Sequence, residues 1–142
     1  MAEIYWNPLV PELGVTDVDA SLDFYRAAGF NVRFRREQPP FAYRELGGAQ
    51  LMLEALHADA WTVGVLEPPF GRGINLQVEV ASARAVGGAL VAAGFALFRE
   101  PTEAWYDVGD VQEGQLEVLA QDPYGHLLRF VESLGRRPAG GV

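Results

Sequence analysis

The 142-residue sequence contains no cysteine, which excludes disulfide bonds, thiolate nucleophiles and cysteine-bound metals. This absence is typical of cytoplasmic proteins, so we expect that location. No apolar run approaches the ~20 residues that a membrane helix needs. The N-terminus carries an acidic residue and lacks the basic segment of a secretory signal. We therefore expect no association with a membrane.

Basic residues are few, with 11 Lys and Arg against 19 Asp and Glu, giving a net charge of −8. Proteins that bind nucleic acid depend on clustered Lys and Arg, so we expect no nucleic-acid partner. An acidic surface attracts small cationic molecules, although the same charge also simply keeps a small protein in solution. The sequence has no G-x-S-x-G, phosphate-binding loop or H-E-x-x-H motif, so the enzyme classes that these motifs mark are not indicated.

A short internal repeat is present, because Ala27-Ala28-Gly29-Phe30 recurs as Ala92-Ala93-Gly94-Phe95. The same order of predicted elements surrounds both copies, and this shared context indicates a duplicated structural unit.

In the first copy, apolar residues predict a strand over Leu9–Val15. Thr16 and Asp19 then form a capping signal at the start of a helix, and Gly29 is suited to end it. Val18, Leu22 and Tyr25 follow at helical spacing and predict a buried stripe. Three further strands are predicted over residues 30–36, 41–46 and 50–55, so the element order is β-α-β-β-β.

In the second copy, strict alternation predicts a strand over Ile74–Val80, and Ser82 is suited to cap the following helix. Strands are predicted over residues 96–99, 115–121 and 127–132, with a turn at Asp122–Gly125. A half of this size buries too little surface to be stable alone. We therefore expect one α+β domain over residues 1–142, with modules at about 8–56 and 73–133, a linker at 57–72, and a tail at 135–142 that frays. The paired, curved, mixed sheets should enclose a trough, with the helices outside.

Several segments together resemble the glyoxalase/bleomycin resistance protein/extradiol dioxygenase (vicinal oxygen chelate) superfamily, and in particular its bleomycin-resistance branch. They extend from about Pro8 to Glu132 and comprise Pro11–Asp17, Ser21–Tyr25, Ala28–Phe30, Gly47–Glu54, Pro69–Asn75 and Asp122–Phe130. The resemblance implies a homodimer that confers antibiotic resistance by sequestering a bleomycin-like or other small cationic, aromatic molecule without chemistry. It also implies a trough in which the enzymes of the superfamily hold a divalent metal.

The metal-ligand positions that the resemblance implies fall on Val10, Glu54, Asn75 and Arg129. Only Glu54 is a usual ligand, while Val10 has no donor atom and the Arg129 cation would repel a metal ion. We therefore expect no metal or other cofactor and no catalytic residue. The alternative is a metal-independent or atypical metal-dependent enzyme of lyase or isomerase type, acting on a small metabolite with Glu12 and Glu54 as a carboxylate pair.

Strand alternation predicts that Glu54 and Arg129 meet in the trough as an ion pair, which either serves a ligand or only neutralises the cleft. The aromatic rings that border the trough would stack on a planar cation, or would pack in the core or at the subunit interface. His57 is expected in a loop and His126 in an exposed turn. The predicted ligand-binding residues are Glu12, Phe41, Glu54, Trp61, Phe70, Asn75, Gln77, Trp105, Tyr106 and Arg129.

Overall fold

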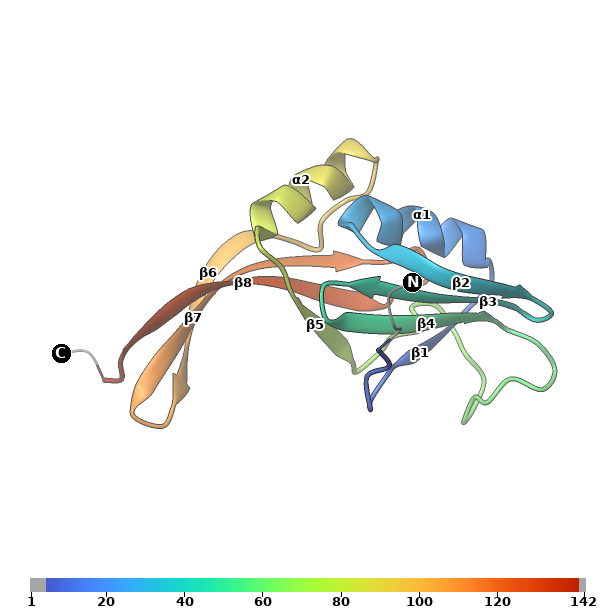
Figure 1. Ribbon diagram of the computed structural model, residues 1–142, viewed down its shortest axis with the longest axis horizontal. Coiled ribbons are helices and arrows are strands. Elements are labelled where there is room, and N and C mark those ends of the chain that lie inside the picture. The colour runs from blue at the N-terminus through green and yellow to red at the C-terminus, as the bar shows by residue number, and fades with distance from the viewer. Residues whose placement is uncertain (1–4, 141–142) are drawn as a thin grey trace.

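The computed structural model describes residues 5–140, which form two successive βαβββ modules (Figure 1). The first module comprises β1 (Glu12–Val15), α1 (Val18–Ala28), β2 (Asn31–Glu37), β3 (Pro40–Leu46) and β4 (Ala49–Ala55). The second comprises β5 (Asn75–Glu79), α2 (Ala83–Ala92), β6 (Arg99–Val108), β7 (Val111–Gln121) and β8 (Leu127–Pro138). The predicted α+β class and the two-module order are confirmed.

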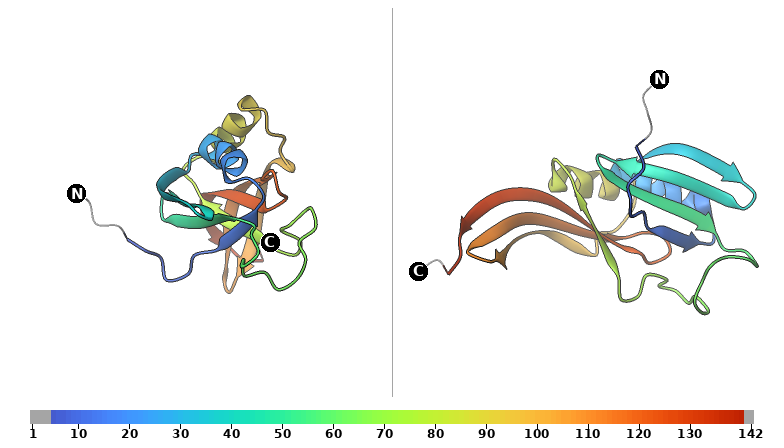
Figure 2. Two further views of the ribbon diagram at one scale, coloured as in Figure 1. Left: turned by 90° about the vertical axis from the view of Figure 1, so that its right-hand side faces the viewer. Right: turned by 60° about the horizontal axis from the view of Figure 1, so that its bottom comes forward.

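Each module forms one mixed four-stranded sheet, with orders β1-β4-β3-β2 and β5-β8-β7-β6. The first strand of each module runs parallel to the last, and the other neighbours are antiparallel. Both helices lie on the same side of the molecule (Figures 1 and 2), so each sheet has one face toward a helix. We call the opposite face of each sheet its open face.

Both ends of helix α1 are set by residues suited to cap a helix. Asp17 is the N-cap residue, and its side chain accepts a hydrogen bond from the Ala20 backbone N–H at 3.2 Å. The predicted cap at Thr16 is therefore wrong by one residue. Gly29 ends the helix with φ 112°, a left-handed conformation that costs glycine little. Leu22 and Tyr25 are fully buried, as the apolar spacing predicted.

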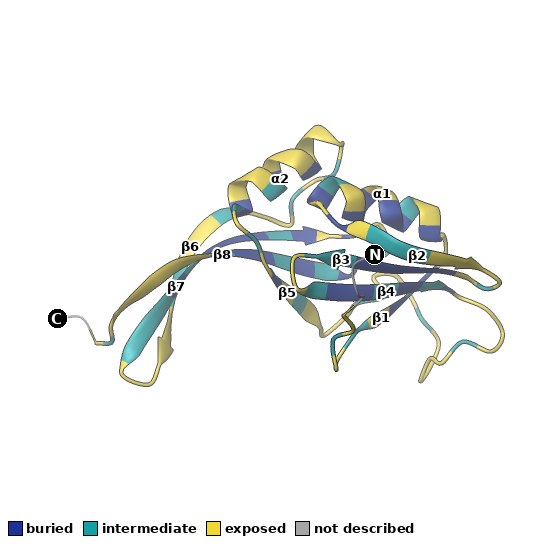
Figure 3. Ribbon diagram, in the orientation of Figure 1, coloured by how far each residue is buried: buried dark blue, intermediate teal, exposed yellow. Residues whose placement is uncertain are grey.

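The core lies between the helices and the sheet faces that they cover (Figure 3). One cluster of buried side chains includes Leu22, Phe24 and Leu53 from the first module and Leu128 and Phe130 from the second. The two helices also pack against each other. Burying apolar surface of both modules in one cluster is the main force that holds them together.

The strand limits of the second module differ from the prediction. Strand β6 spans Arg99–Val108 rather than 96–99, β7 begins at Val111, and β8 continues to Pro138. These extensions form an arm, residues 103–114 and 133–138, that projects beyond the helices (Figures 1 and 2). The tail that we expected to fray from Gly135 is thus paired in β8 as far as Pro138, while residues 141–142 lie outside the described part. In the first module, β1 begins at Glu12 rather than Leu9.

Within residues 5–140, no helix has the length and apolar character needed to cross a membrane.

Candidate functional site

The open face of the first sheet is rich in aromatic and acidic side chains. In the strand register, Glu12 lies beside Met52, and Glu54 lies beside Phe41. Phe34 on the edge strand β2 stacks on Phe41, with ring centroids 5.8 Å apart. Rings at this spacing attract one another and make a flat apolar floor beside the two carboxylates.

A hollow of about 380 Å³ opens above this floor, and we call it the carboxylate hollow. Glu54 lies near the His57 ring, with Oε1 3.4 Å from Nε2, and the Arg36 guanidinium lies 4.5 Å above the Phe41 ring. Burial, together with the charge and a hydrogen bond of Glu54, raises the pKa of Glu12 above its usual value. The residues that line this hollow are Glu12, Arg36, Phe41, Glu54, His57, Asp59 and Trp61.

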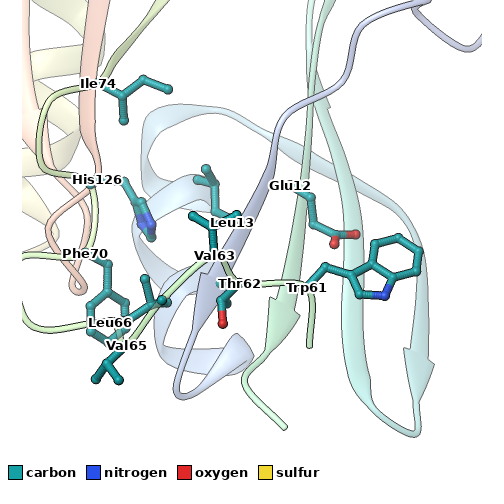
Figure 4. A pocket seen from close by; sticks show the side chains of 13 residues that line it. Glu12, Leu13, Trp61, Thr62, Val63, Val65, Leu66, Phe70, Ile74 and His126 are labelled. Carbon is teal, nitrogen blue, oxygen red and sulfur yellow. The ribbon is translucent and has the colours of Figure 1, made fainter. Parts of the chain in front are cut away.

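A second hollow of about 430 Å³ lies beside the first, between β1, the linker and the turn before β8 (Figure 4), and we call it the apolar hollow. Glu12 and Trp61 line both hollows. The Trp61 side chain is 96% exposed, so its ring is uncovered at the rim that the two hollows share. The apolar hollow is lined by Glu12, Leu13, Gly14, Trp61, Thr62, Val63, Gly64, Val65, Leu66, Phe70, Gly71, Ile74 and His126.

Behind the apolar hollow, a buried polar network joins the two modules. The Tyr25 hydroxyl of α1 donates to Oδ2 of Asp122 at 2.7 Å, and the His126 Nδ1 lies 2.8 Å from the same oxygen. The other Asp122 oxygen accepts from the backbone N–H groups of Tyr124 and His126. Burial alone would raise the pKa of Asp122, but the hydrogen bonds and charge of His126 outweigh it and lower the pKa. Asp122 is therefore ionised at neutral pH.

The same network contains a cation. Arg44 of β3 is completely buried, and its guanidinium lies 3.7 Å from the centre of the Tyr25 ring. None of its three nitrogen atoms has a hydrogen-bond partner among the described residues. Burial lowers the pKa of Arg44 to about 10. The guanidinium is thus stabilised by cation–π attraction to Tyr25 and by the nearby Asp122 charge.

The open face of the second sheet is built differently, around a carboxylate that has its own partners. Glu117 has a side chain 2% exposed and lies 2.9 Å from the Arg99 guanidinium and 3.3 Å from that of Arg129. The Tyr106 hydroxyl donates to it at 2.7 Å. The predicted ion pair between Glu54 and Arg129 is wrong, because Glu54 lies beside His57 and Arg129 lies beside Glu117, each within its own module.

The predicted ligand-binding residues therefore separate into four places. Glu12, Phe41, Glu54 and Trp61 meet at the carboxylate hollow, and Phe70 lines the neighbouring apolar hollow. Asn75, Gln77, Arg129 and Tyr106 lie on the open face of the second sheet, following the register of β5, β8, β7 and β6.

Trp105 lies apart from all of these residues. It occupies the arm in β6, where its ring packs over Gly114 and beneath the Arg137 guanidinium. Trp105 and Tyr106 were predicted in loops, and both are instead in a strand.

Metal ligation does not fit the residues present. Of the implied ligand positions, Val10 offers no donor atom and the Arg129 cation would repel a metal ion. Within residues 5–140, no three His, Asp or Glu side chains are grouped so that they could hold a metal ion.

The expectation for His126 was wrong, since this residue is only 6% exposed rather than on an exposed turn. The linker covers it: Gly71 lies so close that a β-carbon there would sit 2.8 Å from the His126 α-carbon. The sequence signal that could have suggested this is the pairing of Asp122 and His126 across one tight turn. His57 lies in an exposed loop, as predicted.

No family model and no curated protein matches the chain, but solved structures share its fold. TioX from Micromonospora sp. ML1 has 24% sequence identity and a TM-score of 0.68, covering 91% of this chain and 100% of that one. A glyoxalase/bleomycin resistance protein/dioxygenase from Alicyclobacillus acidocaldarius has 15% identity and a TM-score of 0.60, covering 90% and 92%. A bleomycin-binding protein complexed with bleomycin has 18% identity and a TM-score of 0.55, covering 89% and 98%. These similarities establish the predicted fold.

Proposed function

We propose that this protein binds and sequesters a small, cationic, aromatic molecule at the carboxylate hollow, in the manner of a bleomycin resistance protein. The observation that carries the proposal is the carboxylate pair Glu12 and Glu54 beside the free ring of Trp61. A cation placed between the two carboxylates would relieve the repulsion that raises the pKa of Glu12.

The composition of the hollow favours a cation over an anion. Glu12, Glu54 and Asp59 are its acidic side chains, and Arg36 is its single permanently charged base. A planar group could stack on Trp61, for which a cation–π contact contributes about 0.5–2 kcal/mol. The fold supports the same proposal, because it is shared with a protein whose structure contains bleomycin.

Thermal unfolding with bleomycin as the probe tests this function. A ligand at a hundred times its dissociation constant stabilises the native state by about 2.7 kcal/mol, so bleomycin should raise Tm by several degrees. Mn²⁺, Ni²⁺, Zn²⁺ and a chelator should leave Tm unchanged. Bacteria that express the protein should also tolerate more bleomycin. A large stabilisation by one of the metal ions, with none by bleomycin, would overturn the proposal.

We further propose that the protein is a homodimer in which the second subunit closes the hollows. Trp61 and Val65 of the linker are 96% and 92% exposed, and Leu9 and Ile74 nearby are also exposed. An apolar surface of this kind marks an interface. Light scattering during size-exclusion chromatography should give twice the monomer mass, and Val65→Glu should give a monomer. A cytoplasmic location, tested by cell fractionation, completes the proposal.

The raised pKa of Glu12 favours a second candidate, metal-independent acid–base catalysis on a small metabolite. A carboxyl group with a raised pKa beside a second carboxylate is a common arrangement for general acid and base catalysis. Glu12→Gln would abolish such catalysis while preserving the binding of a cation by Glu54. A substrate turned over equally by wild type and Glu12→Gln would contradict this candidate.

A further inference from the structure

The apolar hollow contains a chemical group that the proposed function does not use. Its walls are mainly aliphatic and aromatic, and His126 and Glu12 are its only titratable lining residues within the described part of the chain. Figure 4 shows the His126 ring close to Leu13 and Phe70. Phe70 is held in place by stacking on Tyr124, with ring centroids 5.9 Å apart, so the wall next to His126 is fixed.

The orientation of the His126 ring determines what it can offer. An ionised carboxylate only accepts hydrogen bonds, so the hydrogen between His126 and Asp122 belongs to Nδ1. In the neutral form of the ring, Nε2 carries a lone pair that can accept a hydrogen bond. Nε2 makes no hydrogen bond to any described residue, and it is not among the buried polar atoms that lack a partner. It therefore reaches accessible space, and the apolar hollow is the space that this ring borders.

The groups around the ring hold it in one orientation. Asp122 faces the ring from its own turn, with Tyr25 from α1 and the Arg44 cation from β3 behind that carboxylate. Glu12 of β1 faces the same hollow. A carboxylate bonded to one nitrogen of an imidazole fixes the ring orientation, and with it the direction in which the other nitrogen faces.

We propose that the apolar hollow is a second binding site, for a compact apolar molecule with one acidic hydroxyl group, such as a phenol. The hydroxyl donates its hydrogen to His126 Nε2, and the apolar body lies against Leu13, Leu66, Phe70 and Ile74. This site uses neither Glu54 nor Arg36, so it does not depend on the binding of a cation in the carboxylate hollow.

The probe for the test is 4-nitrophenol, with 4-nitroanisole as its matched control, because methylation removes only the hydroxyl hydrogen. The chain has two histidines, so the His57→Asn variant leaves His126 as the sole imidazole signal in a ¹⁵N NMR spectrum. At a pH where the ring is neutral, we expect the Nε2 signal to move on addition of 4-nitrophenol. We also expect the protein to bind 4-nitroanisole at least tenfold more weakly than 4-nitrophenol.

The second variant is His126→Asn, and circular dichroism checks that it folds. Loss of 4-nitrophenol binding by the folded variant supports the site. If this variant does not fold, the spectrum of His57→Asn still decides the question. Equal affinity for the phenol and its methyl ether, or an Nε2 signal that 4-nitrophenol leaves in place, would overturn the proposal. Bleomycin binding to the wild-type protein is expected to be unchanged at saturating 4-nitrophenol, which separates this site from the carboxylate hollow.

Discussion

The two sheets have the same strand order, but their open faces hold acidic side chains in different ways. On the second sheet, Glu117 is surrounded by Arg99, Arg129 and Tyr106, so its charge is already satisfied. On the first sheet, Glu12 and Glu54 repel one another beside a hollow. Charges with internal partners stabilise a fold, whereas charges without them are available to a ligand. The proposed function therefore assigns a structural role to the second face and ligand binding to the first.

The largest expected effect concerns the network that joins the modules. Asp122→Ala leaves the Tyr25 hydroxyl, the His126 ring and two backbone N–H groups without their acceptor. Loss of such a buried network should lower the free energy of unfolding by about 3–5 kcal/mol. Urea denaturation would measure it. A loss below about 1 kcal/mol would mean that the network does not hold the modules together.

The next prediction compares the two faces directly through the same substitution. Glu117→Gln should lower the free energy of unfolding by about 2–3 kcal/mol, since two guanidinium groups lose a charged partner. Glu54→Gln should change it by less than about 0.5 kcal/mol, because surface positions away from buried networks tolerate substitution. Chemical denaturation of both variants measures the two losses in free energy of unfolding. Equal losses would contradict the predicted difference between the two faces.

Arg44 marks a difference between the helix-covered faces of the two sheets. The corresponding face of β7 carries Leu116, Val118 and Ala120, whereas β3 carries a buried guanidinium without hydrogen-bond partners. Arg44→Met keeps much of the volume and removes the buried charge, so it should raise the free energy of unfolding by about 1 kcal/mol. Tyr25→Phe is the control and should lower it, because Asp122 loses a donor. A destabilised Arg44→Met would show that the cation–π contact outweighs desolvation.

The smallest effect concerns pH, for which two carboxyl groups should act in opposite directions. The pKa of Glu12 is raised in the folded protein, so its stabilising form is the protonated one and is lost as pH rises. Glu12→Gln should therefore raise Tm by about 1 °C at neutral pH, an increase that vanishes below its usual pKa of 4.5.

Asp122 provides the opposite case, because its pKa is lowered. Its stabilisation should be present above its usual pKa of 3.8 and lost as pH falls through the lower folded value. Calorimetry of Glu12→Gln and Asp122→Asn across the acid range would reveal both slopes. If the stability difference from wild type changed with pH in the same direction for both variants, the opposite pKa shifts of Glu12 and Asp122 would be contradicted.

Much of the fold could be predicted from the sequence because its signals are local. The spacing of Val18, Leu22 and Tyr25, the glycine at position 29 and the turn at Asp122–Gly125 each indicate their structure without distant partners. The arm was missed because its strands carry polar residues on both faces, so no alternation marks them.

The site was only partly predictable, because it depends on how distant segments meet. Strand alternation placed Glu12 and Glu54 on one face correctly. It could not show whether Glu54 and Arg129 approach one another, since the placement of one module against the other is not a sequence period. Nor could it show that the linker covers His126, which depends on contacts between Gly71 and the Asp122–Gly125 turn.

Calorimetric titration of bleomycin into the wild type, Glu54→Gln and Glu79→Gln most directly tests which face binds. Glu79 is an exposed carboxylate on the open face of the second sheet, so both substitutions remove one negative charge. We expect saturable binding to the wild type, at least a tenfold weaker affinity for Glu54→Gln, and no more than a twofold change for Glu79→Gln. Equal weakening by the two substitutions would contradict the assignment of binding to the first sheet.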